Sequence, residues 1–356
     1  MKRILFLLAL AALSFSCGRN AYTIDGTFTK ADGTEVYLID LNVSDTIAVT
    51  AVQGGKFVFQ GTVSKPFYAY VGHDRERIRM ILEPGTAAVD LDERTVTGMP
   101  MMEAMNAYNE VFYDFDRVRR EARKALTDRK AEMTDAAFNA AWAELDEVCK
   151  QSKIALCDSM VRANRYNLVG AIVMNDLGMV DPDAFLTLYE ILPAEIQQHY
   201  LVSGPHALAR AVHETTPGKP FKDYTVVGGN PDGTDVKLSD YVGKGKYILL
   251  DHWASWCGPC KAEMPYIKKT WETFAGDRFD VVSVAVSDKR ADTVDALAKL
   301  DMPWHQILDA QKIPSEVYGV NAIPHLILFA PDGTILKRGL RGEEIFTTIS
   351  ELLQRP

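Results

Sequence analysis

Two cysteines separated by two residues form the clearest chemical motif in the sequence. Cys257-Gly258-Pro259-Cys260 follows the segment Tyr247–Trp253, which is predicted to be a buried strand, and opens a segment with helical spacing. The N-terminus of a helix carries about half a positive charge and N–H groups without intrahelical partners. A thiol at that position has a lowered pKa and is nucleophilic near neutral pH. The spacing therefore predicts a redox-active dithiol at the junction of a strand and a helix.

The two cysteines are expected to have different roles. Cys257, at the start of the helix, would attack a disulfide of the substrate and form a mixed disulfide. Cys260, one helical turn further, would resolve it and release the reduced substrate. The other chemistry open to such a motif is half of a zinc site, which needs a second cysteine pair or paired histidines. Only His252 is near in sequence, so no metal is expected.

The segments around the motif predict an α/β domain over residues 217–356, after the linker Pro217-Gly218-Lys219-Pro220. Strand–helix–strand units followed by a hairpin and a terminal helix predict a central mixed sheet covered on both faces. The expected elements are the strand Tyr247–Trp253, a helix from Gly258 to about Gly276, the strand Phe279–Ser287, the helix Ala291–Leu300, the strand His305–Leu308, a helical turn at Ser315–Tyr318, the strands His325–Phe329 and Ile335–Arg338, and the helix Gly342–Leu353.

The segment from Asp251 to Lys261 closely resembles the active site of the thioredoxin family. The resemblance continues with Pro265 and with Ile323-Pro324, which matches the cis-proline loop of that family. It implies a thioredoxin-like fold that performs thiol–disulfide exchange through its own cysteines, without a bound cofactor. It also implies a set of residues that contact the substrate. These are Trp256, Gly258, Pro259, Ile323 and Pro324.

Glu263, three residues after the second cysteine, is similar to a glutamate of the TlpA/ResA reductases of bacterial envelopes. The leading β segment and the helical insert of this chain look like Bacteroidetes lipoproteins of that group. The resemblance implies a reductase of disulfides in envelope proteins that receives electrons from a membrane donor, because the sequence has no flavin or nicotinamide motif. Apocytochrome c thiols, and hence cytochrome c biogenesis, are one target of related reductases, but no feature of this sequence selects them.

Two carboxylates compete for the transfer of a proton to and from Cys260. Asp251 matches the buried acid of thioredoxin, and Glu263 matches that of the envelope reductases. A buried carboxylate has a raised pKa and can exchange a proton near neutral pH. His325 stands after the expected cis-proline, where threonine is common, and a protonated imidazole there would stabilise the Cys257 thiolate. The alternative for each of the three is a solvated side chain.

Three other functions use the same residues. A disulfide oxidase or isomerase would differ from a reductase only in reduction potential. A thiol peroxidase of the related peroxiredoxins has a threonine three residues before its reactive cysteine, where this chain has Ala254. A binding protein would capture its ligand with the β segment and use the redox site only on that ligand.

The first part of the mature chain predicts an antiparallel β-sandwich-like domain over residues 17–98. Short strands with alternating or β-branched residues recur between turns such as Asp32-Gly33 and Gly54-Gly55. The expected strands are Tyr22–Phe28, Glu35–Leu41, Thr46–Val52, Lys56–Gln60, Phe67–Val71, Ile78–Leu82 and Ala87–Leu91.

Residues 99–216 show the spacing of helices, with helix starts expected at Asp181-Pro182 and Leu192-Pro193. Cys149 and Cys157 would lie about 12 Å apart along one helix, too far for a disulfide, and are expected to pack as small hydrophobic residues. Histidines recur at intervals of seven at His199, His206 and His213, which would suggest a metal-binding face on one helix. Ser203-Gly204-Pro205 is expected to interrupt any single helix through them, so metal binding is not expected.

The N-terminus predicts export. Lys2 and Arg3 precede an apolar run of about ten residues, which fits a signal peptide over residues 1–16. Small residues before Cys17 predict acylation of that cysteine and a lipoprotein that faces the periplasm. The 356 residues exceed a single core and carry a net charge of −9 without a basic block, which disfavours a nucleic-acid partner.

Overall fold

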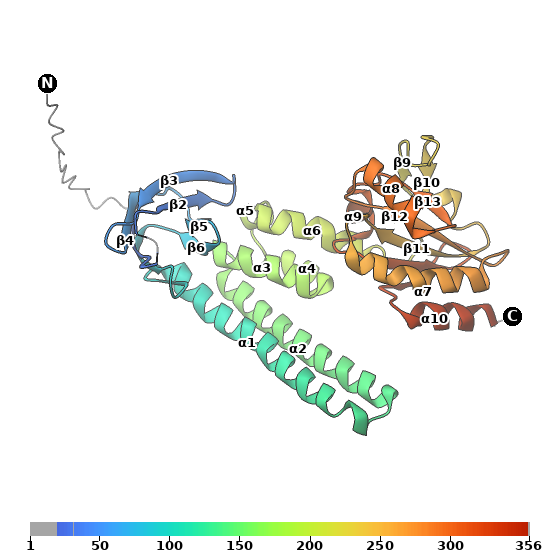
Figure 1. Ribbon diagram of the computed structural model, residues 1–356. Coiled ribbons are helices and arrows are strands. Elements are labelled where there is room, and N and C mark those ends of the chain that lie inside the picture. The colour runs from blue at the N-terminus through green and yellow to red at the C-terminus, as the bar shows by residue number, and fades with distance from the viewer. Residues whose placement is uncertain (1–19, 31, 355–356) are drawn as a thin grey trace. The chain divides into compact units, whose positions relative to one another are not determined.

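The computed structural model describes residues 20–30 and 32–354 (Figure 1). The predicted signal peptide, residues 1–16, and the predicted lipidation site Cys17 lie outside the described residues. The chain divides into two compact units: the described residues up to Val173 together with Leu192–Tyr200, and Met174–Ile191 together with the described residues from Leu201 onward. The helical segment is therefore shared between the units. Within the described part of the chain, no helix has the length and apolarity to cross a membrane.

The N-terminal strands form two four-stranded sheets, with strand orders β4-β1-β7-β8 and β3-β2-β5-β6. Alternate side chains point inward, so that Ile24, Val36 and Leu38 are fully buried. The predicted β-sandwich-like class is confirmed, with one parallel pair, β1 with β7, among antiparallel ones. The strands are β1 (Ala21–Thr27), β2 (Glu35–Asp40), β3 (Asp45–Ala51), β4 (Lys56–Thr62), β5 (Phe67–His73), β6 (Glu76–Leu82), β7 (Gly85–Asp90) and β8 (Thr95–Thr97).

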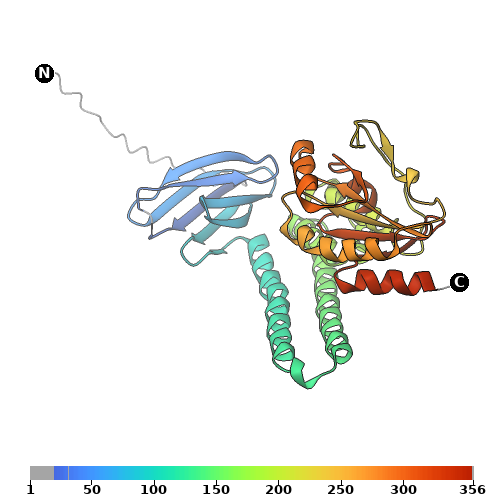
Figure 2. The ribbon, with the colours of Figure 1, turned by 45° about the vertical axis from the view of Figure 1, so that its right-hand side comes forward.

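The middle segment is helical, as predicted. Its first two helices, α1 (Pro100–Asp128) and α2 (Asp135–Asn164), run antiparallel as a long hairpin joined by the 3-10 turn Lys130–Glu132 (Figure 2). Cys149 and Cys157 are buried in α2, which confirms that they pack as hydrophobic residues. The remaining helices are α3 (Leu168–Val180), α4 (Pro182–Tyr189), α5 (Ala194–Gln197) and α6 (Tyr200–His213).

One expectation about these helices is wrong. Helix α6 continues through Ser203-Gly204-Pro205, where an interruption was predicted. A proline removes one hydrogen bond of the helix, but Pro205 here packs against α3. A Cβ atom on Gly178 would lie 3.2 Å from the Cβ of Pro205, so the two helices are in close contact.

The C-terminal part is an α/β domain around a five-stranded mixed sheet of order β13-β12-β11-β14-β15. Strands β11, β12 and β13 are parallel, whereas β14 and β15 are antiparallel to their neighbours. The predicted thioredoxin-like fold is confirmed. Its elements are β9 (Thr225–Val226), β10 (Val236–Lys237), the 3-10 turn Leu238–Asp240, β11 (Tyr247–Trp253), α7 (Gly258–Phe274), β12 (Phe279–Ala285), α8 (Arg290–Leu300), β13 (His305–Ile307), α9 (Ile313–Tyr318), β14 (His325–Phe329), β15 (Ile335–Arg338) and α10 (Glu343–Gln354).

The central sheet has an apolar core on each face. Helices α7 and α10 lie side by side over one face, where Leu249 and Leu328 pack with Ile345 (Figure 1). On the other face, Leu250 and Ile327 pack with residues of α9 and of the β9–β10 hairpin. Because β11 is buried on both faces, it is mostly apolar, and its two polar residues, Asp251 and His252, are themselves fully buried. Both cores hold the end of β11, and the cysteine loop that follows it, in a fixed place.

Helix α6 is packed tightly onto the loop that follows α9. Gly319 has a φ of +66°, and a Cβ atom there would lie 2.4 Å from Cγ2 of Val212 and 3.0 Å from the carbonyl oxygen of Leu208. We expect Gly319→Ala to lower the free energy of unfolding by about 2 kcal/mol or more, through both backbone strain and overpacking. Urea denaturation would measure this change. Unchanged stability would mean that α6 does not pack against this loop.

Candidate active site

The two cysteines of the motif lie where β11 passes into α7. Cys257 is the N-cap residue of the helix, and its Sγ accepts a hydrogen bond of 3.1 Å from the backbone N–H of Cys260. The two sulfurs form a disulfide, in which Cys257 is 3% exposed and Cys260 is fully buried. The same N–H, together with the positive end of the helix, stabilises a negative charge on Cys257 Sγ when the disulfide is reduced.

A cis peptide bond places a second loop beside the first. The bond between Ile323 and Pro324 is cis, and the carbonyl oxygen of Ile323 lies 3.9 Å from Cys257 Sγ. The guanidinium of Arg341 donates hydrogen bonds to the carbonyl oxygens of Pro324 and Leu340. Residues about 66 positions apart in sequence thus meet at the reactive sulfur, with Arg341 holding the backbone of the cis-proline loop.

The residues just before Cys257 are held by Ser287 and Asp288, which follow β12. The indole N–H of Trp256 donates to the carbonyl oxygen of Ser287 at 3.0 Å, while the residue is 63% exposed. The Asp288 carboxylate accepts from the backbone N–H of Ser255 at 2.6 Å and from its hydroxyl at 3.0 Å. An exposed aromatic side chain next to a reactive sulfur is suited to contact a substrate.

Asp251 is fully buried in β11, six residues before Cys257. Burial raises the pKa of its carboxyl group to about 7, even though the Ser283 hydroxyl donates a hydrogen bond of 2.9 Å to it. The indole N–H of Trp304 in turn donates to the Ser283 oxygen at 2.8 Å. The other oxygen of Asp251 has no hydrogen-bond partner in the structure. Such a group takes up and releases a proton near neutral pH.

Glu263 lies on α7 and is only partly buried. Its carboxylate accepts a hydrogen bond of 2.8 Å from the backbone N–H of Gly342, and its charge contributes to the raised pKa of Asp251. The structure therefore gives the two predicted carboxylates different environments. Asp251 has the environment expected of a proton carrier, while Glu263 joins α7 to the loop that contains Arg341.

Comparison with known proteins agrees with this arrangement. The Redoxin family model matches residues 216–353, and a model described as a domain of unknown function, DUF4369, matches residues 22–105. The thiol-disulfide oxidoreductase ResA of Bacillus subtilis is 28% identical over 106 residues, which are 30% of this chain and 58% of the relative. ResA of Oceanobacillus iheyensis is 29% identical over 104 residues, 29% of this chain and 53% of the relative.

Residues 216–353 match the Redoxin family, and part of them is similar to ResA; we refer to these residues as the redoxin domain. The matched part spans less than two thirds of the length of these curated relatives. Among solved structures, the thioredoxin domain of a thiol-disulfide oxidoreductase from Bacteroides vulgatus is 31% identical, with a TM-score of 0.36, and covers 39% of this chain and 99% of its own.

The structure contradicts one expectation for the redoxin domain. One of the two interpretations of His325 was a protonated imidazole that stabilises the Cys257 thiolate. Burial lowers its pKa to about 3, and the nearby groups His252, Arg338 and Arg341 add to this effect. The Arg338 guanidinium lies 3.2 Å from Nε2 of His325, which fits a neutral ring that accepts a hydrogen bond. His325 therefore carries no charge near neutral pH, mainly because burial disfavours the charged imidazole, and the positive charge of Arg338 adds to this effect.

Four residues of the redoxin domain site were not predicted. Ser283 and Trp304 hold Asp251, Asp288 holds the cysteine loop, and Arg341 holds the cis-proline loop. None is part of a local motif, since each acts across the fold on a residue at least 17 positions away. A charged residue just beyond a buried strand, as Asp288 is after β12, was the one signal in the sequence. In the described part of the chain no group of three His, Cys, Asp or Glu is placed to hold a metal ion.

The hydrogen bond from Ser283 gives a test of the buried acid. This bond lowers the pKa of Asp251 against the effect of burial. We expect Ser283→Ala to raise that pKa further and to move the midpoint of the pH–rate profile for disulfide exchange upward by about one pH unit. Trp304→Phe leaves the bond between Ser283 and Asp251 intact and is the matched control, with a smaller shift expected. Identical profiles for Ser283→Ala and wild type would show that Asp251 does not govern the rate.

Proposed function

We propose that this protein reduces disulfides in proteins of the bacterial cell envelope, with Cys257 as nucleophile and Cys260 as resolving cysteine. One observation carries the proposal: a Cys-Gly-Pro-Cys disulfide whose first sulfur accepts an N–H at the start of α7 and faces the cis-proline loop. A sulfur in that position is the better nucleophile and the better leaving group of the pair.

The reaction is two thiol–disulfide exchanges. In the reduced protein, the Cys257 thiolate attacks one sulfur of the substrate disulfide, the S–S bond breaks, and the other substrate sulfur leaves as a thiolate that takes up a proton. Cys260 then loses its proton and attacks Cys257 Sγ, which forms the internal disulfide and releases the second substrate thiol. The substrate gains two electrons and two protons, and the protein dithiol is oxidised.

Asp251 is suited to accept the proton of Cys260 during the second exchange. With a pKa of about 7, it is deprotonated in a large fraction of molecules near neutral pH and can become protonated without a large cost. Its position on the buried strand that leads into the cysteine loop keeps this proton away from bulk solvent. Trp256, Gly258, Pro259, Ile323 and Pro324 are proposed to form the surface that contacts the substrate.

The cycle needs a reductant. An envelope compartment is oxidising, so we propose that a membrane protein with a reactive dithiol reduces the Cys257–Cys260 disulfide after each turnover. Attachment of the N-terminus to the membrane through an acylated Cys17 would keep the protein near that donor. The chemistry at the cysteines needs no bound cofactor, because the electrons pass through sulfur alone.

The direction of exchange is tested by the reduction potential of the Cys257–Cys260 pair. Equilibration with reduced and oxidised glutathione, followed by alkylation of free thiols and mass spectrometry, would give this value. We expect a potential close to that of thioredoxin, about −270 mV. A value near about −120 mV would instead identify a disulfide donor. A pair that forms no disulfide in any buffer would disprove the proposed function.

A further inference from the structure

An apolar groove with a volume of about 1000 Å³ lies beside the redox disulfide, within the second compact unit of the chain. Part of its lining comes from the redoxin domain and includes Trp256, Val320 and Ile323. The rest comes from α3 and α6, with Met179 and Leu208. These helices precede the residues that match the Redoxin family, so this part of the groove is an addition to the redoxin fold.

Two residues that line the groove, Trp256 and Ile323, lie next to the reactive sulfur. Trp256 directly precedes Cys257, and the carbonyl oxygen of Ile323 lies 3.9 Å from Cys257 Sγ. Because Cys257 is only 3% exposed, a substrate disulfide can approach it from few directions. A polypeptide that delivers its sulfur to Cys257 between Trp256 and Ile323 therefore has its neighbouring residues in or near the groove.

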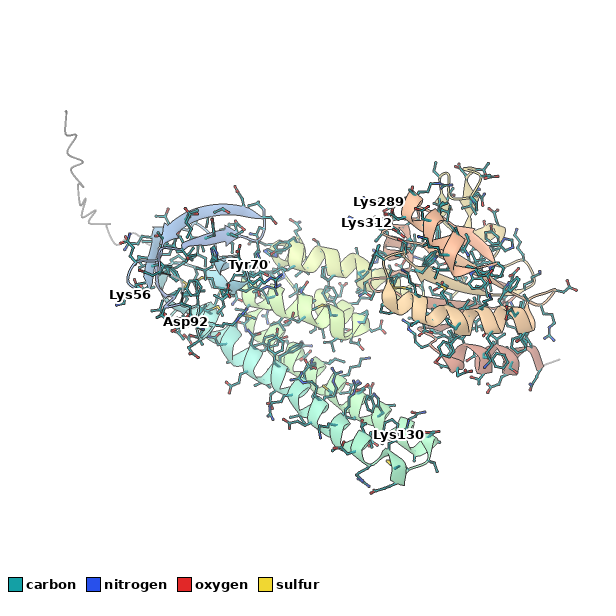
Figure 3. The ribbon with its side chains drawn as sticks, viewed as in Figure 1. Lys56, Tyr70, Asp92, Lys130, Lys289 and Lys312 are labelled. Carbon is teal, nitrogen blue, oxygen red and sulfur yellow. A yellow bond between two sulfur atoms is a disulfide. The ribbon has the colours of Figure 1, made fainter. Side chains whose placement is uncertain are left out.

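The lining contains large apolar side chains that remain open to solvent. Met179 is 72% exposed and Trp256 is 63% exposed. Exposed apolar side chains that share a concave surface indicate a surface that a partner covers. Polar groups also line the groove, among them Lys312, which stands at the start of α9 (Figure 3), and Asn321. The combination suits a polypeptide, which presents apolar side chains together with polar backbone groups.

The helical part of the groove is firmly attached to the redoxin domain. Helix α6 lies so close to Gly319 that a Cβ atom on this glycine would overlap the side chain of Val212. Just beyond α6, the Arg338 guanidinium donates to the hydroxyl of Thr215 at 2.7 Å and to the carbonyl oxygen of Tyr318 at 2.6 Å. These contacts fix the end of α6 to β15 and to α9. The groove is thus a preformed site and requires no closure of a mobile segment.

We propose that this groove binds an extended segment of the substrate polypeptide, and that Met179 and Leu208 select substrates whose cysteine is flanked by apolar side chains. The proposal rests on the proposed thiol–disulfide exchange at Cys257. A volume of about 1000 Å³ is at the upper end of the range for small-molecule sites and is more than one cystine needs. The middle helices thereby give the redoxin domain a selectivity that its own fold lacks.

The test is a single-turnover reduction by the full protein in its dithiol form. Three disulfides serve as substrates: a cyclic peptide with Leu and Phe beside its cysteines, a peptide of equal length with Ser and Asn at those positions, and oxidised glutathione. Wild type is expected to reduce the apolar peptide fastest. Met179→Asn is expected to slow reduction of the apolar peptide about 10-fold or more, mainly by raising the peptide concentration needed to reach the half-maximal rate. The rate of reduction of oxidised glutathione should stay the same.

Two pairs of matched variants separate recognition from folding. Met179→Asn is compared with Val294→Asn, which changes an exposed side chain on α8 outside the groove. Gly204→Glu is compared with Gly276→Glu, since a side chain has room at both glycines but only Gly204 lines the groove. We expect only Met179→Asn and Gly204→Glu to lower the rate of reduction of the apolar peptide selectively.

Each result has one meaning. Two results would show that the groove is not a specificity site, while leaving the exchange reaction intact. One is that wild type reduces the two peptides at equal rates. The other is that Met179→Asn and Gly204→Glu slow reduction of the apolar peptide and of oxidised glutathione by the same factor. A wild-type protein that reduces none of the three disulfides would instead refute the proposed function itself.

Discussion

Replacing Cys260 with serine is expected to trap this protein as a mixed disulfide with its substrate. Cys257 remains the N-cap of α7, with an N–H directed at its sulfur, and keeps the environment that favours a thiolate. Without the second thiol, the intermediate cannot resolve within the protein, and turnover should fall by at least about 1000-fold. Alkylation followed by mass spectrometry of the full protein would detect a covalent adduct that reductant removes.

The matched variant is Cys257→Ser, which should form no adduct and show no turnover. Cys260 is fully buried beneath the helix start, so it is a poor nucleophile toward a large substrate. Cys149→Ser is a second control, because that thiol is buried in α2 in the other compact unit. Adducts on Cys257→Ser but not on Cys260→Ser would mean that the two cysteines have the reverse roles.

Much of the redoxin domain could be predicted from sequence because its constraints are local. The segment Tyr247–Trp253 is mostly apolar since β11 is buried on both faces, and the turn at Pro331-Asp332-Gly333 follows from its residue types. The Cys-Gly-Pro-Cys motif itself indicates where α7 begins, because its proline suits the first turn of a helix. The strands β9 and β10 were missed because two residues each leave no periodic pattern.

The parts that sequence did not reveal depend on contacts across the fold. A charged imidazole was one interpretation of His325 after the cis-proline, yet its charge state is determined by burial and by Arg338, thirteen residues later. Helix α6 continues through Pro205, which packs closely against Gly178 in another helix. The groove beside the disulfide likewise arises because α3 and α6 meet the redoxin domain, which no local pattern in residues 168–213 indicates.

Replacing Asp251 with asparagine is expected to change both the stability and the rate, each in a defined pH range. The pKa of Asp251 is raised from its ordinary value of 3.8 to about 7, so the folded protein holds this proton more tightly than the unfolded chain does. The associated stability is present in full below about pH 4 and is lost as the pH rises through 7. Because asparagine cannot ionise, the variant should not show this loss of stability as the pH rises.

The expected difference is large. Between pH 4 and pH 9, wild type should lose on the order of 3–4 kcal/mol of unfolding free energy that Asp251→Asn retains. Any constant cost of burying the amide is the same at every pH and leaves the difference unchanged. Urea denaturation at several pH values would measure it. Parallel stability curves for the two proteins would show that Asp251 does not ionise over this range.

The effect on rate has the opposite sign and identifies the proton carrier. In wild type, resolution by Cys260 should accelerate as Asp251 loses its proton around pH 7. In Asp251→Asn, resolution should be about 100-fold slower at pH 8, and its rate should show no rise around pH 7. Glu263→Gln is the informative companion, because removal of its charge lowers the pKa of Asp251. If Asp251 carries the proton, this variant keeps the acceleration and moves its midpoint to lower pH. If Glu263 carries it, Glu263→Gln abolishes the acceleration and Asp251→Asn preserves it.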